Sequence, residues 1–183
     1  MAIQNLRGLL NGVRGRYLAV CLGLALQGCS PTFNWREVAL EGTAVNVMLP
    51  CKPDQAHRPV PVAGLVATLR MSGCDTGGAT FAVSWMDLAN DAVAGQAIDP
   101  WKQSILGNMQ AAASSEGPWD LKNARPASRP MRLTAKGVRP GGGVVYAQAG
   151  WFILDRTVFH LAVFSADPKL QAAEDFFSGV KLP

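Results

Sequence analysis

The sequence predicts an α+β domain in which an antiparallel β-sheet is flanked by helices, and three observations favour this class. Apolar and polar side chains alternate along several short segments, which is typical of half-buried strands. Residues that favour turns separate neighbouring segments of this kind, as in antiparallel hairpins. Two further segments carry apolar residues at helical spacing, and an Asp-Pro pair precedes each of them. Antiparallel hairpins with helices packed against them are typical of the α+β class.

The alternating pattern predicts three strands in the first half of the domain. Residues 43–49, 62–72 and 79–85 alternate between apolar and polar side chains. Turn-forming residues at 75–78 separate the last two segments, which therefore form a predicted hairpin. Residues 51–61 are rich in proline and charge, and we interpret them as an exposed loop.

The first helix is expected to begin at Asp99-Pro100. Aspartate is a favourable N-cap, and proline is tolerated at the first helical position. An apolar stripe follows this pair, and the helix is expected to end near Ser115. We interpret the preceding residues, 87–95, as a polar loop or short turn.

The sequence pattern predicts three more strands and a closing helix in the second half of the domain. Residues 132–138, 144–154 and 157–165 alternate, and the last two segments form a long predicted hairpin. Asp167-Pro168 is expected to open the final helix in the same way as the first. Gly179 is a suitable residue to end it.

The first 28 residues resemble a lipoprotein signal peptide. Three arginines precede an apolar run at 17–26, which is about half of the ~20 residues that a membrane-spanning helix needs. The run leads into Leu26-Gln27-Gly28-Cys29, which resembles the bacterial lipobox, although Gln27 is larger than the usual residue there. We expect cleavage before Cys29 and a lipid on its thiol. Ser30 follows the cysteine, which by resemblance to known sorting signals favours the periplasmic face of the outer membrane over the inner membrane. An ordinary signal peptide or an uncleaved leader, with Cys29 incidental, is the alternative.

This interpretation divides the chain into a signal peptide at 1–28, a lipidated tether at 29–36 and one α+β domain at 37–183. Residues 1–28 contain three of the 17 Lys and Arg residues and none of the 13 acidic residues, so the remaining chain has a net charge of +1. A nearly neutral domain lacks the basic footprint of nucleic-acid binding, and we expect no nucleic-acid partner. Phe33 and Trp35 either pack on the domain or lie at the membrane interface, and packing is favoured.

Cys51 and Cys74 are the two cysteines of the predicted mature domain, and we expect them to form a disulfide. An even pair in an oxidising compartment favours a bridge, which would stabilise the fold by about 3 kcal/mol. Two buried free thiols, or a metal site that includes His57, are the alternatives. A metal would need more ligands than these three residues supply, and we expect no metal or other cofactor.

The most concentrated charge of the predicted mature chain is a basic segment at 122–139, which no acidic residue interrupts. Its members are Lys122, Arg125, Arg129, Arg132, Lys136 and Arg139. Pro126 and Pro130 exclude one continuous helix, so a strand with Arg132 and Lys136 pointing to water explains part of the pattern. The functional alternative is an anion-binding patch for phosphate headgroups or an acidic partner.

The sequence contains no recognisable catalytic arrangement. The G-x-S-x-G, H-E-x-x-H and C-x-x-C motifs are absent from it, and its two histidines fall in separate elements. We interpret His57 as a solvated loop residue and His160 as a structural strand residue. Asp87 and Asp91 could in principle perform acid–base chemistry, but their surroundings are typical of a polar loop. We therefore expect that the protein is not an enzyme.

Three segments resemble the PsbP-like family. They are a strand that ends in Val47-Met48-Leu49-Pro50, the long hairpin through 146–164, and a closing helix at 172–180 that carries Phe176 and Phe177. The resemblance covers about residues 37–183 and implies an α/β/α sandwich with an antiparallel sheet between helices. The family includes photosystem II accessory proteins and bacterial lipoproteins of unknown function, so the resemblance implies an accessory role rather than catalysis. It identifies no binding residue.

Two functions are compatible with these patterns. The first is a membrane-tethered periplasmic domain that binds another envelope protein, with Trp85, Trp119 or Trp151 as candidates for an exposed aromatic patch. The alternative is binding of anionic lipid headgroups or envelope polymers through the basic 122–139 segment, which would be sensitive to salt. The sequence favours the first.

Overall fold

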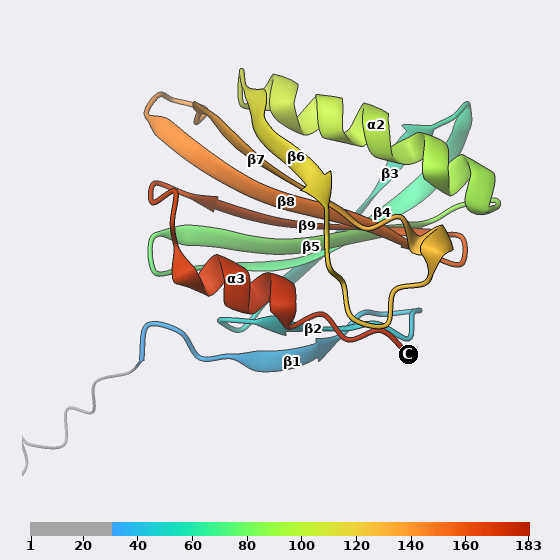
Figure 1. The fold of residues 1–183 in the computed structure, drawn as a ribbon, viewed down its shortest axis with the longest axis horizontal. Coiled ribbons are helices and arrows are strands. Elements are labelled where there is room, and N and C mark those ends of the chain that lie inside the picture. The colour runs from blue at the N-terminus through green and yellow to red at the C-terminus, as the bar shows by residue number, and fades with distance from the viewer. Residues whose placement is uncertain (1–30) are drawn as a thin grey trace, which may run out of the picture. The chain divides into compact units, whose positions relative to one another are not determined.

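The computed structural model describes residues 31–183, which form a seven-stranded sheet, a two-stranded sheet and helices (Figure 1). The predicted signal peptide and Cys29 lie outside the described residues. The strands are β1 (Arg36–Ala39), β2 (Asn46–Leu49), β3 (Asp54–Val62), β4 (Leu65–Thr76), β5 (Ala79–Asp87), β6 (Ala112–Pro118), β7 (Met131–Val138), β8 (Val144–Leu154) and β9 (Thr157–Ser165). The helices are α2 (Asp91–Asn108), α3 (Gln171–Ser178) and a short 3-10 helix, η1 (Pro126–Ser128).

The large sheet has the strand order β3-β4-β5-β9-β8-β7-β6, and each neighbouring pair is antiparallel. Helix α2 packs on one face of this sheet, against β8 and β9. Helix α3 and the β1–β2 hairpin pack on the opposite face (Figure 1). Helices thus cover both faces of one antiparallel sheet, which confirms the predicted α+β class. Within residues 31–183, neither helix is long and apolar enough to cross a bilayer.

Each face of the sheet has its own apolar core. Trp151 of β8 is fully buried and belongs to the first core together with Leu106 of α2. In the second core, Phe81 of β5 meets Phe176 of α3 edge to face, with ring centroids 5.7 Å apart. Phe152, which directly follows Trp151 in β8, points into this second core. Successive residues of a strand point to opposite faces, and this produces the alternation visible in the sequence.

The strand predictions are confirmed over much of the chain. Strands β8 and β9 have the predicted bounds, and β7 begins one residue before the predicted segment 132–138. The hairpin of β4 and β5 turns at Gly77 and Gly78, both of which have positive φ. Glycine adopts positive φ without steric cost, and the turn predicted at residues 75–78 is therefore confirmed.

The folded domain begins earlier than predicted, within the expected tether. Phe33 and Trp35 both pack against Phe81, with ring centroids 6.3 and 6.4 Å away, as the packing interpretation requires. The Asn34 amide donates a hydrogen bond to the Pro50 carbonyl, 2.7 Å away. The compact unit therefore starts at Thr32 rather than at residue 37.

The prediction that residues 51–61 form a loop is wrong, because most of them form the edge strand β3. Its residues pair with β4 from Asp54 to Val62. Pro59 and Pro61 lie within the strand, which is possible because an edge strand has one unpaired side on which no N–H is needed. The exposed, proline-rich composition therefore indicates an edge strand here rather than a loop.

Helix α2 begins nine residues before the predicted start, with Asp91 instead of Pro100 as its first residue. Asn90 is its N-cap, and the Asn90 Oδ1 accepts a hydrogen bond from the Val93 amide at 3.0 Å. Pro100 lies inside the helix, not at its first turn. Residues 90–95 therefore form the N-cap and first turns of the helix, not the predicted loop. Asn90-Asp91 and Asp99-Pro100 are both favourable sequences for a helix start. Only the packing of Ala94 and Ala97 into the core selects the earlier one.

The predicted ends of the helices also need correction. Helix α2 stops at Asn108 instead of Ser115, since Gln110 takes a left-handed conformation and residues 112–118 form β6. Helix α3 begins at Gln171 rather than at Asp167-Pro168. The Asp167 carboxylate instead accepts a hydrogen bond from the Lys169 amide, in a turn that precedes the helix. The predicted cap at Gly179 is confirmed.

Cys51 and Cys74 form a disulfide, with Cα atoms 6.0 Å apart. Cys51 follows β2, and Cys74 lies in β4, opposite Phe81 of β5. The bridge therefore joins the β1–β2 hairpin to the large sheet. This arrangement replaces the two alternatives, free thiols and a metal site with His57.

Candidate functional site

The basic segment does not form one surface. The Arg132 guanidinium donates hydrogen bonds to both carboxylate oxygens of Glu174 in α3, at 2.9 and 2.8 Å. It also lies 4.0 Å from the centre of the Phe177 ring. Lys136 lies over the Tyr146 ring on the same side of the sheet. Arg132 is therefore a structural residue that holds α3 to β7, and its charge is already neutralised.

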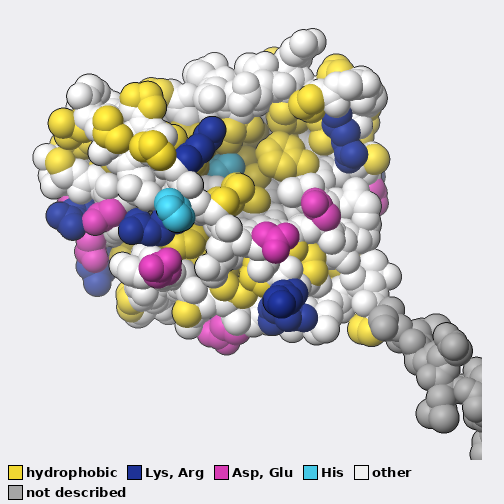
Figure 2. Space-filling view, turned by 180° about the vertical axis from the view of Figure 1, so that it is seen from behind, with side chains coloured by type: hydrophobic (Ala, Val, Ile, Leu, Met, Phe, Trp, Pro, Cys, Tyr) yellow, Lys and Arg dark blue, Asp and Glu magenta, His cyan; other side chains and the backbone are white. Residues whose placement is uncertain are grey.

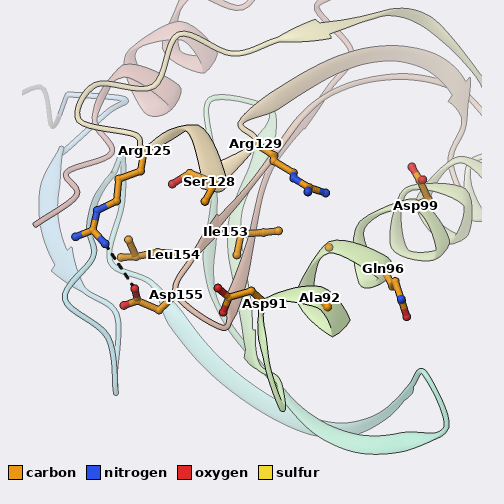
Figure 3. A pocket seen from close by; sticks show the side chains of 12 residues that line it. Asp91, Ala92, Gln96, Asp99, Arg125, Ser128, Arg129, Ile153, Leu154 and Asp155 are labelled. Atoms are coloured by element: carbon orange, nitrogen blue, oxygen red, sulfur yellow. Dashed lines mark ion pairs between the residues drawn. The ribbon is translucent and has the colours of Figure 1, made fainter.

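Arg125 and Arg129 both line a cavity of about 620 Å³ between η1, the start of α2 and the β8–β9 turn, where their side chains point in different directions (Figure 3). Three acidic residues also line it, namely Asp91, Asp99 and Asp155. Arg125 forms an ion pair with Asp155 at 3.8 Å, and both side chains are largely exposed. The cavity is thus of mixed charge. Lys122 is exposed before η1, and Arg139 lies beside the C-terminal end of α2, so neither lines this cavity.

The prediction of an exposed aromatic patch at Trp85, Trp119 or Trp151 is wrong. All three side chains are buried, with 3%, 7% and 0% of their surface exposed. Trp85 donates its indole N–H to the Glu41 carbonyl, and Trp119 packs edge to face on Phe177. Trp85 and Trp151 occupy core positions of the alternating strands β5 and β8, so their spacing favours burial.

The two histidines have structural or solvated positions, as interpreted from the sequence. His57 is exposed on β3. His160 lies between Trp101 and Trp151, with ring centroids 5.0 and 4.7 Å away. Burial lowers the pKa of His160 to about 3, so the ring is neutral at physiological pH. Its Nε2 has no hydrogen-bond partner among residues 31–183.

A search for metal ligands in residues 31–183 finds no group of three His, Cys, Asp or Glu side chains that could hold an ion. Asp87, one of the acidic pair considered for acid–base chemistry, instead binds the β8–β9 turn. It accepts hydrogen bonds from Arg156 at 2.8 Å and from Thr157 at 3.3 Å. Asp91 lies in the first turn of α2, where a carboxylate stabilises the helix. The two carboxylates thus have separate structural partners.

A groove runs along α2 where the helix leaves the sheet uncovered, and we call it the α2 groove. A cavity of about 440 Å³ forms it. Figure 2 shows this side of the molecule, where hydrophobic side chains gather around a hollow. The apolar residues that line the groove include Val60, Val62, Leu69, Met86 and Trp101. Polar side chains of α2 lie at its rim, among them Gln96 and Ser104.

The groove exists because one helix cannot cover seven strands. Strands are spaced about 4.8 Å apart, so the sheet is roughly 29 Å across, whereas a helix is about 10 Å wide. Helix α2 lies over β8 and β9, and the apolar side chains of β3 and β4 extend beyond it. Leu65 is the clearest case, since 55% of its surface is exposed on the side of β4 that also carries Leu69.

No pattern in the sequence predicts the α2 groove directly. Leu65, Leu69 and Met71 alternate as core residues do, and nothing local distinguishes a covered face from an open one. Two observations together would predict the groove. Recognition of β3 as a strand widens the sheet, and the sequence offers a single long helix to cover this face. The groove combines an apolar floor with a polar rim, which is the composition of protein-binding surfaces.

Comparison with protein-family models and with curated protein sequences gives no match. Among solved structures, the cyanobacterial PsbP protein (CyanoP) from Synechocystis is similar, with a TM-score of 0.50 and 11% sequence identity. The alignment covers 87% of this chain and 99% of that one. A protein of unknown function from Pseudomonas aeruginosa, described as a putative regulator, has a TM-score of 0.38 and 12% identity over 78% of this chain and 90% of that one. The chain therefore has a PsbP-like fold, and at this identity the likeness concerns the fold alone.

Proposed function

We propose that this chain is a lipoprotein, anchored at the periplasmic face of the outer membrane, which binds another envelope protein through the α2 groove. The observation that carries the proposal is the open apolar strip beside α2. Soluble domains seldom leave such a strip without a partner, and burial of apolar surface is the main source of association energy. The occupant is a protein segment whose apolar side chains pack on the floor of the groove and whose polar groups face its rim.

The role is binding rather than catalysis. Its support is the chemistry of the described residues. His160 is neutral and stacked between two indoles, and His57 is solvated. The PsbP-like fold, which this chain shares with CyanoP, supports this role, because the resemblance to that family implies an accessory function and the groove beside α2 has an apolar lining.

The lipid anchor rests on the lipobox at Leu26–Cys29 and on the start of the fold. The folded unit begins at Thr32, so three residues of chain length separate it from Cys29. An extended chain spans at most about 3.6 Å per residue, so the domain would lie within roughly 11 Å of the acylated cysteine. The groove would then meet partners close to the membrane.

The anchor is tested by the mass of the mature protein purified from membranes. We expect a chain that starts at Cys29, carries acyl groups and gains two hydrogens on reduction of the Cys51–Cys74 bridge. A Cys29→Ser variant should appear in the soluble periplasmic fraction or remain uncleaved. An unmodified chain that starts at Met1 would overturn the anchor.

The groove is tested by photo-crosslinking in cells. A photoreactive amino acid at Ser104, on the rim of the groove, should form an adduct with one envelope protein. The matched control is the same amino acid at Gln103, which is exposed on α2 but does not line the groove. Equal adducts from both positions, or none from Ser104, would contradict docking in the groove.

A further inference from the structure

The point where the folded unit meets its N-terminal extension lies at one end of the large sheet. The Thr76 hydroxyl at the end of β4 donates a hydrogen bond to the Thr32 carbonyl. Phe33 packs so closely on Gly77 in the β4–β5 turn that a Cβ there would lie 2.7 Å from its ring. Thr32 is therefore fixed beside this turn, and any anchor on Cys29 holds this end of the domain.

The β7–β8 turn lies at the same end of the sheet. Strand register places Ala79 opposite Ser165, Ser165 opposite Tyr146, and Tyr146 opposite Lys136. These four residues form one row across β5, β9, β8 and β7. The β4–β5 turn and the β7–β8 turn both continue beyond this row, about three strand spacings, or roughly 14 Å, apart.

The β7–β8 turn has the composition of a membrane-contacting loop. Val138 and Val144 flank it, and 42% and 50% of their surfaces are exposed. Arg139 follows Val138, and Lys136 precedes it on β7. Neither basic side chain forms an ion pair with any residue in 31–183. We call residues 136–144 the β7–β8 tip.

The acidic residues at this end are engaged within their own turns. The Asp75 carboxylate accepts a hydrogen bond from the Thr80 hydroxyl. The Asp167 carboxylate accepts one from the Lys169 amide at 2.9 Å. Exposed valines between unpaired cations match a bilayer surface, whose headgroups attract cations and whose interior accepts apolar side chains.

We propose that the β7–β8 tip lies on the surface of the membrane that anchors the protein, with Val138 and Val144 in the interface and Lys136 and Arg139 on anionic headgroups. The proposal rests on the proposed lipid anchor at Cys29. It gives the domain a fixed orientation in which α2, whose C-terminal end adjoins the tip, rises away from the bilayer.

A weak contact is sufficient for this role. The anchor keeps the tip within a few nanometres of the bilayer, so insertion is an intramolecular step with an effective concentration in the millimolar range. Two valines and two cations would bind free vesicles poorly without the anchor. The tip orients an anchored domain and does not recruit a soluble one.

The experiment places a nitroxide label at the tip of the full, acylated protein in nanodiscs of phosphatidylcholine and phosphatidylglycerol. Because Cys29 is acylated and Cys51 is bonded to Cys74, a Val144→Cys variant has one free thiol for labelling in the mature chain. The matched control is Val66→Cys, which is 77% exposed near the β3–β4 turn at the opposite end of the sheet. We expect the label at 144 to be several-fold more accessible to dissolved oxygen, relative to a polar nickel reagent, than the label at 66.

Charge reversal tests the headgroup contact. Lys136→Glu with Arg139→Glu should return the label at 144 to the accessibility of the label at 66. Arg58→Glu with Lys122→Glu, at exposed positions away from this end, should leave it in the lipid. The proposal is overturned if the labels at 144 and 66 have equal accessibility in the wild-type background, or if the tip reversal has no effect. A protein whose mass shows no acyl chain would instead overturn the anchor itself, and the two failures are therefore separate.

Discussion

The Arg132 guanidinium forms a paired hydrogen bond with the Glu174 carboxylate, at 2.9 and 2.8 Å, and thereby joins β7 to α3. The hydrogen bonds from Arg132 hold the pKa of Glu174 below its usual value, although partial burial acts in the opposite direction. The guanidinium also donates to the Gln148 side chain at 2.8 Å and covers the Phe177 ring. A residue that sequence pattern assigned to a solvated basic patch thus belongs to the contact between a helix and the sheet.

Arg132→Ala should lower the free energy of unfolding by about 1–2 kcal/mol, because it removes a bidentate ion pair and a cation–π contact that are partly screened by solvent. The matched control is Lys122→Ala, an exposed basic residue of the same segment, for which we expect a change within about 0.5 kcal/mol. Urea unfolding curves of the two variants check this. Equal midpoints for both would contradict the structural role of Arg132.

His160 should make the fold less stable as the pH falls. Its pKa is near 6.5 in the unfolded chain and about 3 in the folded one, because burial disfavours the charged ring. The unfolded state therefore binds the extra proton between these values, and stability is complete above pH 6.5 and is lost progressively toward pH 3. At pH 5 the loss from this residue amounts to about 2 kcal/mol.

A His160→Phe variant keeps an aromatic ring between Trp101 and Trp151 but cannot be protonated. Its unfolding free energy should change less between pH 7.5 and pH 5 than that of the wild type. The lowered pKa values of Glu37 and Glu174 contribute to the acid dependence of both proteins, so the difference between the two profiles isolates the histidine. Parallel profiles would show that His160 takes no part.

Reduction of the Cys51–Cys74 disulfide should destabilise the domain by about 3 kcal/mol, since the bridge closes a loop with a sequence separation of 23 residues. The β1–β2 hairpin should lose protection first, because this bridge ties it to β4. Hydrogen exchange of reduced and oxidised protein measures both effects. Uniform loss of protection over all strands would contradict the local role given to the bridge.

Gly137 of β7 should not tolerate alanine. A Cβ at this position would collide with the Met109 carbonyl oxygen at the end of α2 and lie 2.8 Å from the Met109 Cβ. Gly137→Ala should cost about 1–3 kcal/mol, because α2 must shift from its packed position. Gly107→Ala, inside α2 and with nothing within 4 Å of the new methyl group, should instead stabilise by about 0.5–1 kcal/mol. Thermal unfolding of both variants tests the opposite signs.

Sequence patterning predicted the interior strands well and the edges poorly. β8 and β9 are buried on both faces or on one strongly apolar face, so their alternation and length were unambiguous. β3 and β6 are exposed edge strands with polar, small or proline residues, and their backbone pairing with β4 and β7 has little side-chain signature. The missed strands are therefore those whose stability comes mainly from the neighbouring strand.

The candidate site was harder to predict than the fold. The α2 groove depends on how far one helix extends over a sheet, and no single segment contains that information. The prediction of an exposed tryptophan patch was wrong although the local pattern contained the information, because Trp85 and Trp151 are large residues at core positions of alternating strands. Arg132 is not part of a free basic patch, because its guanidinium donates a hydrogen bond to Glu174, which lies 42 residues away in sequence.

The two prolines of β3 have a consequence for many copies of the chain on one surface. Pro59 and Pro61 are two residues apart, so their nitrogens point to the same side, which in an edge strand is the unpaired one. The far edge is interrupted too, by a register shift between Ala113 and Ser115 of β6. Anchored proteins are confined to two dimensions, where crowding favours edge-to-edge polymerisation of sheets. Interrupted edges would allow this domain to be densely packed on a membrane and still remain separate molecules.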